Sequence, residues 1–351
     1  MKSNLRFSIM ALLILMALVA VGSFLVLLPL KALRSAQEEA IAARLAAEER
    51  ALAAIAAAKE QELAFREERD RVSATAAKLQ QQGSASPTPT PSDLKLLAWN
   101  IESDGNDPAT IAGQLTELGP YDLIALQEVK PENMPLYEET FRQTHGDRFR
   151  AYGASTGNAD RLMLLFDAER LQPIDMRELF EQDGIVVNPG KYRSPLIAHF
   201  RDQRDGTEFL VLTVHLARGD AEFRQQQAEG LRRWADAQRL PILALGDFNM
   251  DYDFRTEQGN AAFDQFLMDG IWQWVRPETL VDTNWYDGDQ DGQDDYPGSM
   301  LDFVFTAGGD WQVTCKTLVR DGDFPDDEAT SDHRPIEVIV GPTRSADDTT
   351  R

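Results

Sequence analysis

Asn, Asp, Glu and His side chains stand repeatedly at the ends of short apolar runs in the second part of the chain. Carboxylates are the oxygen ligands that Mg²⁺ and Mn²⁺ prefer, an imidazole beside a carboxylate stabilises charge or moves a proton, and Asn amides orient oxygens. A polar group against an apolar run costs free energy unless it is paired, so the repetition indicates one convergent polar site. The segments are Leu96–Glu102, Leu126–Glu128, Val214–Leu216, Gly246–Asn249, Leu301–Phe303 and Ser331–Pro335.

Each segment taken alone also has an ordinary structural explanation. Glu128 could be a solvated strand cap, His215 a core histidine with its hydrogen bonds satisfied, and Asp247-Phe-Asn249 a turn. Ser331-Asp332-His333 could be an Asx turn that enters a strand. Their occurrence together, in one order along the chain, is what favours a catalytic site.

The elements that must position these residues are expected to be short strands buried on both faces, because the apolar runs are rich in β-branched and aromatic residues. Helical patterning, opened each time by Asp, Asn or Pro, lies between them at 108–118, 133–144 and 220–238. This mixture predicts two packed sheets with helices outside, in one α/β domain. The expected strands are Leu94–Trp99, Tyr121–Gln127, Leu162–Phe166, Leu196–Phe200, Phe209–Val214, Ile242–Leu245, Leu301–Phe305 and Ile336–Val340.

The ordered motifs resemble those of the endonuclease/exonuclease/phosphatase superfamily, whose members include deoxyribonuclease I-like enzymes. The resemblance extends over about residues 94–341, and it implies a metal-dependent phosphoesterase on a four-layered αββα sandwich, with two mixed sheets flanked by helices. The motifs are Trp99-Asn100, Gln127-Glu128, Thr213-Val-His215, Gly246-Asp247-Phe-Asn249, Leu301-Asp302 and Ser331-Asp332-His333-Arg-Pro.

The resemblance also implies a set of metal ligands for Mg²⁺ or Mn²⁺. Glu128 would be the principal ligand, joined by Glu102, Asn100 and Asp332. Glu102 stands where some members carry Asp, a change that lengthens the side chain and leaves the number of metal ions open.

Catalytic and phosphate-binding roles are implied for a second set of residues. Asp247 and Asn249 would position or deprotonate the attacking water, while His215 and His333, the latter oriented by Asp302, would contact the phosphate. Arg193, in the segment Tyr-Arg-Ser-Pro-Leu, matches an Arg-x-Pro pattern of the family and would hold a phosphate oxygen; a plain surface arginine is the alternative.

The charge of the chain restricts its partners. The formal net charge is −23, and residues 94–341 hold 22 basic and 46 acidic side chains against 11 and 10 in residues 1–93. A surface this acidic repels polyphosphates unless cations intervene, which excludes a basic nucleic-acid coat. Cys315 is the single cysteine, so an internal disulfide and a thiolate zinc site are excluded as well.

One acidic segment resembles a calcium-binding loop. Asp287, Asp289 and Asp291 occupy its first three ligand positions, followed by Gly292 and later by Asp295, but position twelve is glycine in place of the closing Glu. A bound Ca²⁺ and a merely solvated acidic loop both stay open.

The amino-terminal part predicts a membrane attachment. Residues 7–30 contain no charge, and 24 residues at about 1.5 Å each give a helix of roughly 36 Å, enough to cross a bilayer. We expect residues 1–30 to be a retained single-pass anchor with its amino terminus inside, which would place the catalytic domain outside the cytoplasm. A cleaved signal peptide is the alternative, and the lysines and arginines on the two sides of the span are nearly balanced.

The segment after the anchor is expected to be a stalk. Residues 31–82 contain no Gly or Pro and have the composition of a long exposed helix, either solitary or self-associating as a coiled coil with a stutter. A stiff Pro/Thr/Ser linker at 83–93 would connect it to the catalytic domain at 94–341, with a disordered tail at 342–351.

Three functions remain after this sequence reading. The leading one is a membrane-tethered phosphodiesterase of the endonuclease or exonuclease type. The second is a phosphoesterase of phospholipid headgroups or small phosphorylated molecules, resembling sphingomyelinases or inositol phosphatases. The third is a catalytically silent binding scaffold, which has no chemical reason to keep the whole set of ligands together with Asp247 and His333.

Overall fold

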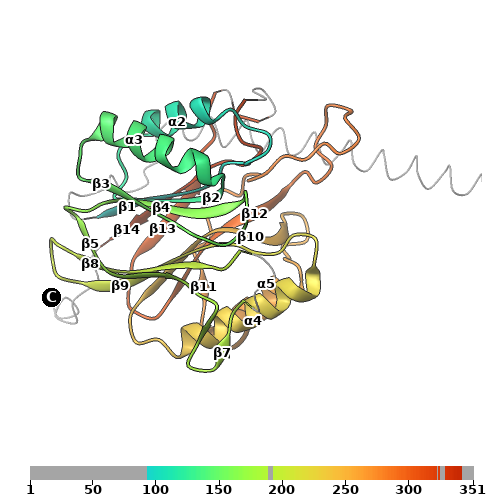
Figure 1. Ribbon diagram of the computed structural model, residues 1–351. Coiled ribbons are helices and arrows are strands. Elements are labelled where there is room, and N and C mark those ends of the chain that lie inside the picture. Colours follow the sequence, from blue (N-terminus) through green and yellow to red (C-terminus); the bar gives the residue numbers. More distant parts are fainter. Residues whose placement is uncertain (1–92, 189–192, 322, 325–328, 342–351) are drawn as a thin grey trace, which may run out of the picture. The chain divides into compact units, whose positions relative to one another are not determined.

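The computed structural model describes residues 93–188, 193–321, 323–324 and 329–341, all within one compact unit (Figure 1). The predicted anchor, stalk, most of the linker and the tail lie outside these residues and stay predictions. None of the helices in the described part is long and apolar enough to span a bilayer.

Six strands form the first sheet, in which one parallel pair is flanked by antiparallel neighbours. The parallel pair is β1 and β2, and the helix α2 connects them. The order across the sheet is β13 (Val313–Thr317), β14 (Ile336–Val340), β1 (Leu94–Asn100), β2 (Leu123–Val129), β4 (Arg161–Asp167) and β3 (Phe149–Gly153).

The second sheet repeats this plan. Its parallel pair is β9 and β10, connected by the helix α4, and its other neighbours are antiparallel. The order across the sheet is β11 (Gln273–Trp274), β12 (Ser299–Ala307), β10 (Ile242–Asp253), β9 (Glu208–His215), β8 (Leu196–Asp202) and β5 (Leu171–Glu178). A small hairpin of β6 (Glu181–Gln182) and β7 (Ile185–Val186) lies outside both sheets.

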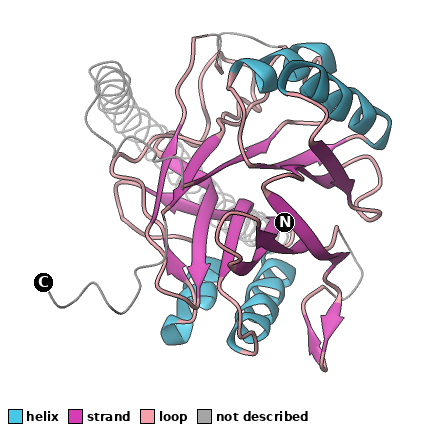
Figure 2. Cartoon of the chain, turned by 90° about the vertical axis from the view of Figure 1, so that its left-hand side faces the viewer, coloured by secondary structure: helices cyan, strands magenta, loops and turns pink. Residues whose placement is uncertain are grey.

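Helices cover the outer face of each sheet. Figure 1 shows α2 (Pro108–Glu117) and α3 (Met134–His145) over the first sheet, and α4 (Ala221–Asp236) and α5 (Ala261–Leu267) over the second. Short 3₁₀ turns precede α3 at Pro131–Asn133 and follow α5 at Met268–Gly270. In the rotated view of Figure 2 the helices again lie on opposite sides of the paired sheets. The predicted sandwich of two mixed sheets with flanking helices is therefore confirmed.

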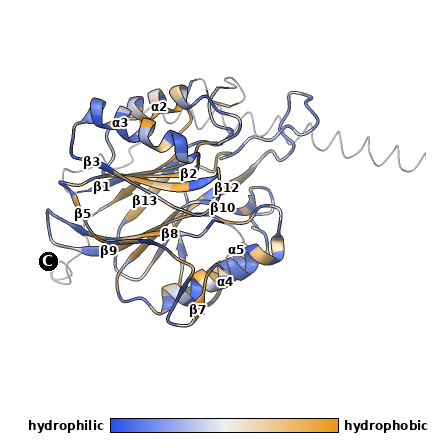
Figure 3. Cartoon of the chain, viewed as in Figure 1, coloured by the Kyte–Doolittle hydropathy of each residue, from blue (hydrophilic) through white to orange (hydrophobic). Residues whose placement is uncertain are grey.

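Burial explains why two sheets and two helical layers form. Successive side chains of a strand point to opposite faces, so Leu96 and Ala98 of β1 enter the core between the sheets while Leu97 and Trp99 enter the core beneath α2 and α3. A third core lies between the second sheet and the helices α4 and α5. Figure 3 shows hydrophobic colour along the strands and hydrophilic colour on the outer surfaces of the helices.

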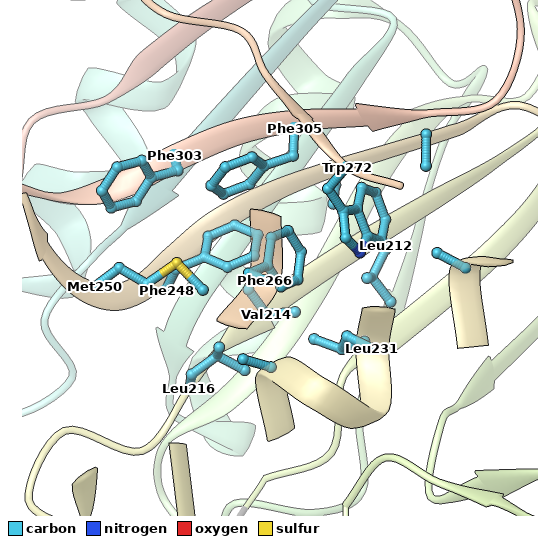
Figure 4. Close-up of a cluster of buried hydrophobic side chains, with 14 of the residues drawn as sticks. Leu212, Val214, Leu216, Leu231, Phe248, Met250, Phe266, Trp272, Phe303 and Phe305 are labelled. Atoms are coloured by element: carbon cyan, nitrogen blue, oxygen red, sulfur yellow. The ribbon is translucent and has the colours of Figure 1, made fainter. Parts of the chain in front are cut away.

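Aromatic rings dominate the third core (Figure 4). Phe248 of β10 lies with its ring centroid 5.4 Å from that of Phe266 and 4.9 Å from that of Phe305, and Phe266 stacks on Trp272 at 4.9 Å. Because buried aromatic rings have few rotamers and large contact areas, this cluster holds β10 firmly from one side. Residues on either side of Phe248 in the sequence belong to the polar site described next.

All eight predicted strands and all three predicted helices are present, and most of their ends shift by a few residues. The exception is β10, which was predicted to end at Leu245 and continues to Asp253. The prediction lacked β3, β5, β13 and α5, together with the shortest strands. The strands β3, β5 and β13 are outermost in their sheets, where one edge and much of one face meet solvent. Their sequences are consequently mixed in polarity, as in the LQPIDMRE of β5, and do not form an apolar run.

Candidate active site

The predicted polar residues meet at the carboxyl ends of the two parallel strand pairs. In the second sheet, Asp247 of β10 lies in register with His215 of β9 on one side and with Asp302 of β12 on the other. In the first sheet, Asn100 is the last residue of β1 and Glu128 the penultimate residue of β2. The site therefore forms where both sheets end on the same side of the sandwich.

Asp247 joins the two halves of the site. Its Oδ2 accepts a hydrogen bond of 3.0 Å from Asn100 Nδ2, which crosses from one sheet to the other. The same oxygen lies 3.3 Å from His215 Nε2 and 4.0 Å from His333 Nε2. Asp247 is 1% exposed, so these contacts form in a nearly water-free environment where electrostatic interactions are strong.

The expected metal ligands lie together at the end of the first sheet. Asn100 Nδ2 donates to Glu128 Oε1 at 3.1 Å, and Asn100 Oδ1 accepts from the backbone N–H of Glu102 at 3.1 Å. Glu102 Oε2 accepts from the backbone N–H of Asp332 at 3.0 Å, and Glu128 Oε2 accepts from that of Ser103 at 3.3 Å. These bonds fix each carboxylate while leaving other lone pairs available.

The electrostatics of this group fit a divalent cation. Burial raises the pKa of Asp332 to about 7, against the lowering effect of His333 and with smaller individual increases from Glu102, Glu128 and Asp247. Burial and the neighbouring Glu128 likewise raise the pKa of Glu102, against the hydrogen bond from the Asp332 backbone. Crowded buried carboxylates of this kind repel one another, and a bound cation would relieve that repulsion. The donor set, carboxylates with one amide oxygen, is that of a hard cation such as Mg²⁺ or Mn²⁺.

Asn249 lies in the irregular part of β10 after Asp247, where the pairing with β12 shifts in register. The backbone N–H of Asn249 donates to Asp247 Oδ1 at 2.9 Å, and Asn249 Nδ2 donates to the carbonyl of Leu216 at 3.0 Å. Burial raises the pKa of Asp247 and Asp302 raises it further, whereas His215, His333 and the Asn249 backbone lower it. A carboxylate with a raised pKa is a stronger base, as a group that accepts a proton from water requires.

The two histidines differ in charge. His333 Nδ1 lies 2.7 Å from Asp302 Oδ2; burial lowers the pKa of His333, but the carboxylates of Asp302, Asp332 and Asp247 outweigh it and hold the pKa well above its usual value. Burial, together with Arg193, lowers the pKa of His215 to about 4. At neutral pH, His333 is therefore a cation suited to an anionic phosphate, whereas His215 is neutral.

Three residues of the site have a left-handed backbone conformation. Glu102, Glu128 and Asn249 all have positive φ, at 52°, 57° and 51°, a conformation that costs free energy for residues other than glycine. Gly246 has φ of 135°, and a Cβ there would lie 2.5 Å from the carbonyl oxygen of Val214. The same conformation also occurs at residues outside the site, such as Asp183 and Asp269, so it does not by itself distinguish the functional positions.

Arg193 lies beside the site, but its guanidinium is engaged within the protein. It forms an ion pair through Nη1 with Asp160 Oδ2, and its Nε donates to the carbonyl of His215 at 3.0 Å. Asp160 was missed in the sequence reading. It directly precedes β4, but Arg161 separates it from the apolar run that begins at Leu162.

Asp160 extends the cluster of potential metal ligands. Its Oδ1 lies 3.6 Å from His215 Nδ1, and Glu128 Oε1 lies 3.7 Å from the same nitrogen. Two groups of three residues could each hold a metal ion, because within each group the potential ligand atoms lie within 4.8 Å of one another. The first group is Glu128, Asp160 and His215, and the second is Asp247, Asp302 and His333.

Three of the four acidic residues of the predicted calcium loop lie close together. Asp287, Asp289 and Asp291 bring carboxylate oxygens within 4.8 Å of one another, whereas Asp295 Oδ2 instead accepts from the backbone N–H of Gly288 at 2.9 Å. The oxygens of Asp287 accept from the backbone N–H groups of Asp291 and Gly292. Such bonds also form in a solvated acidic turn, so Ca²⁺ at this loop stays a prediction.

Comparison with known proteins agrees with this fold. Residues 97–333 match the Endonuclease/Exonuclease/phosphatase family, and the chain belongs to that family. It is a hydrolase that acts on phosphoric ester bonds. No curated protein matches it at the level of sequence.

Several solved structures are similar to the chain. They include a family member from Bacteroides thetaiotaomicron (18% identity, TM-score 0.53, covering 73% of this chain and 100% of that one) and the mannosyl-6-phosphatase Bt3783 of the same organism (18%, 0.51, 71% and 100%). The D. rerio protein TDP2, in complex with a single-stranded DNA product, is similar at 15% identity with a TM-score of 0.54, covering 72% and 100%. At these identities the likeness concerns the fold alone.

Proposed function

We propose that this chain is a divalent-metal-dependent phosphodiesterase whose active site is the group of residues around Asp247. The observation that carries the proposal is the hydrogen bond from Asn100 to Asp247, which joins the predicted metal ligands of one sheet to the predicted water-activating and phosphate-contacting residues of the other. A scaffold without catalysis would not require buried carboxylates and histidines to converge at this cost in desolvation.

The side chains divide the reaction between them. Asp247 accepts the proton of the attacking water, and Asn249 orients that water or a phosphate oxygen. His333, held by Asp302 in the protonated form, stabilises the negative charge that develops at the phosphate, while neutral His215 donates a hydrogen bond to the phosphate. Glu128, Glu102, Asn100 and Asp332 would hold a divalent cation, which would supply neutralisation of the charge on the phosphate and the leaving group. No covalent intermediate is required.

Charge around the site favours short or small substrates. Arg193 is paired with Asp160, and Lys130 Nζ lies 3.2 Å from Asp104 Oδ1, so neither cation is free for a long phosphate backbone. The acidic loop begins next to the site, because the backbone N–H of Trp285 donates to the carbonyl of Asp332 at 2.7 Å. These observations also favour a second candidate function, hydrolysis of phospholipid headgroups or other small phosphate esters.

A substrate panel separates the two candidates. The full chain, purified in detergent, is incubated with single-stranded and duplex DNA, RNA, sphingomyelin, inositol phosphates, sugar phosphates and a generic phosphodiester, each with Mg²⁺ and with a chelator. We expect Mg²⁺-dependent cleavage of short nucleic acids and of the generic diester. Turnover of lipid or monoester substrates alone would establish the second candidate, and no turnover of any of them would refute both.

We further propose that residues 7–30 anchor the enzyme in a membrane with residues 94–341 outside the cytoplasm. The length and the lack of charge of this segment support the proposal. After fractionation, the full chain should remain with the membranes in alkaline carbonate, and protease added to intact cells should release a fragment of about the size of residues 94–351. Protection of that fragment until the membrane is lysed would reverse the orientation, and a soluble chain would exclude the anchor.

A further inference from the structure

The pairing of Arg193 leaves the phosphate without the arginine that the sequence reading assigned to it. Nη1 of Arg193 pairs with Asp160, and its Nε is used by the carbonyl of His215. A guanidinium already neutralised by a carboxylate attracts a phosphate less than an unpaired one does. The described residues offer another arginine at this end of the sandwich.

Arg218 lies in the loop between β9 and α4, and other side chains hold the backbone of this loop in place. Arg224, which is 6% exposed, donates through Nη1 to the carbonyls of Ala217 at 2.7 Å and of Arg218 at 2.8 Å. Buried Gln227 accepts from the backbone N–H of Ala217 at 3.0 Å. The loop is thus fixed at successive residues, and the position of Arg218 is set before any substrate arrives.

The side chain of Arg218 points to the catalytic centre. Its Nη1 donates to Asn249 Oδ1 at 3.2 Å, and Asn249 in turn donates its backbone N–H to Asp247. Asn249 is a neutral amide, so this hydrogen bond does not compensate the positive charge. Within the described part of the chain, no Asp or Glu forms an ion pair with Arg218, although the domain carries a large acidic excess.

We propose that Arg218 is the cation that binds the phosphate group of the substrate, in the role that the sequence reading gave to Arg193. The inference rests on the proposed function, because it places the phosphate beside Asn249 and Asp247. A phosphate oxygen can replace the weak contact with Asn249 by a charge-assisted, bidentate hydrogen bond to the guanidinium, which is stronger and directional. Because Arg218 is exposed, it also favours esters whose phosphate group is accessible from solvent.

Binding of inorganic phosphate tests this inference without turnover. Calorimetry on the full chain with Mg²⁺ would compare the wild type with Arg218→Gln and Arg218→Lys. The Gln side chain carries no charge and ends about two bonds short of the position of Nη1, so it removes the contact with Asn249 Oδ1 as well. Mispositioning of Asn249 alone would lower kcat and leave the affinity for inorganic phosphate unchanged, which separates the two roles. We expect Arg218→Gln to weaken phosphate binding, and to raise KM for the hydrolysed ester, by about tenfold or more, with Arg218→Lys intermediate and melting temperatures unchanged.

Arg204→Gln is the matched control. Arg204 is an exposed arginine of the β8–β9 hairpin, at the end of β9 opposite to His215, and its substitution should change neither phosphate affinity nor KM. If folded Arg218→Gln protein binds phosphate as tightly as the wild type, the inference about Arg218 is overturned. The proposed function is left intact by that result as long as the wild-type enzyme hydrolyses its ester. Arg218-dependent phosphate binding in a chain that hydrolyses no ester would refute the proposed function and support the anion site alone.

Discussion

At the scale of single residues, hydroxyl side chains hold the backbone of the site residues in place. Ser331 Oγ donates to the carbonyl of Asn100 at 2.6 Å and accepts from the backbone N–H of His333 at 2.9 Å. Thr283 Oγ1 accepts from the backbone N–H of Asp302 at 3.2 Å. Such contacts orient the groups that act on the substrate. Loss of an outer partner of this kind at a metal site typically lowers metal affinity or activity by about 10–100-fold.

Glu128→Gln tests the assignment of the principal metal ligand. The amide is nearly isosteric with the carboxylate and keeps an oxygen for Asn100, so the fold and the melting temperature should be retained. Hydrolysis should fall by more than about 100-fold, beyond the 10–100-fold that loss of an outer partner causes, and Mg²⁺ titration should show weaker binding. Glu139→Gln on the exposed surface of α3 is the control. Activity equal to wild type across millimolar Mg²⁺ would rule out the assignment.

Most of the site could be predicted from the sequence, because each residue borders an apolar run whose strand direction determines where it goes. Asp247 and His215 are examples, since parallel neighbours end at the same edge of a sheet. Arg218 and the pairing of Arg193 with Asp160 could not be predicted. Those contacts depend on loop conformations that tertiary hydrogen bonds set, which no local pattern encodes.

At the scale of elements, the fold consists of two similar halves in which a helix connects two parallel strands. The helix α2 begins at Pro108 after Asp107, whose side chain accepts from the backbone N–H groups of Ala109 and Thr110, and α4 begins after Asp220, which accepts from Phe223. These caps fix where α2 and α4 begin after the loops that follow β1 and β9. Predicting α2, α4 and the buried strands was possible because their signals are local, whereas the edge strands β5 and β13 carry mixed sequences that tertiary pairing alone makes into strands.

Two helical glycines give a test of how closely α4 packs. A Cβ at Gly230 of α4 would lie 2.5 Å from the carbonyl oxygen of Val186 and 2.8 Å from Val187 Cα, while one at Gly113 of α2 would meet nothing within 4 Å. Alanine is the better helix former, so Gly113→Ala should raise the free energy of unfolding by about 0.5–1 kcal/mol. Gly230→Ala should lower it by about 1–3 kcal/mol, because the backbone of Val186 and Val187 must move.

Denaturant unfolding followed by circular dichroism measures both changes. An equal stabilisation by the two substitutions would contradict the close approach of α4 to β7 that the structure shows.

At the scale of the whole molecule, the negative charge of the catalytic domain opposes the binding of negatively charged phosphate substrates. The catalytic domain is strongly acidic, and its few cations near the site are largely paired, so a long polyanion gains little from its surface. A bound divalent cation, protonated His333 and Arg218 are the positive groups that we expect a substrate phosphate to meet. We therefore expect the molecule to bind a single phosphate group more readily than an extended nucleic-acid backbone.

This charge distribution predicts weak, weakly salt-dependent DNA binding. Each duplex phosphate neutralised by a protein cation contributes about 0.9 to the slope of log affinity against log salt. With no more than about three such contacts, the slope should not exceed about 2.7, the affinity should be micromolar or weaker, and short or single strands should be preferred. Titrations of labelled duplex and single-stranded DNA at fixed Mg²⁺ and varied salt measure these quantities. Tight duplex binding with a steep salt dependence would contradict the account.

The central claim is that the residues around Asp247 form a metal-dependent site for phosphoester hydrolysis. Its most direct test is the rate at which the detergent-purified full chain hydrolyses bis(p-nitrophenyl) phosphate with Mg²⁺, with chelator, and after Asp247→Asn. The account predicts turnover with Mg²⁺, none with chelator, and a decrease of roughly 10²–10⁴-fold in the variant at an unchanged melting temperature, since a general base contributes about that factor. Turnover that persists in chelator, or a folded Asp247→Asn protein as active as the wild type, would contradict it.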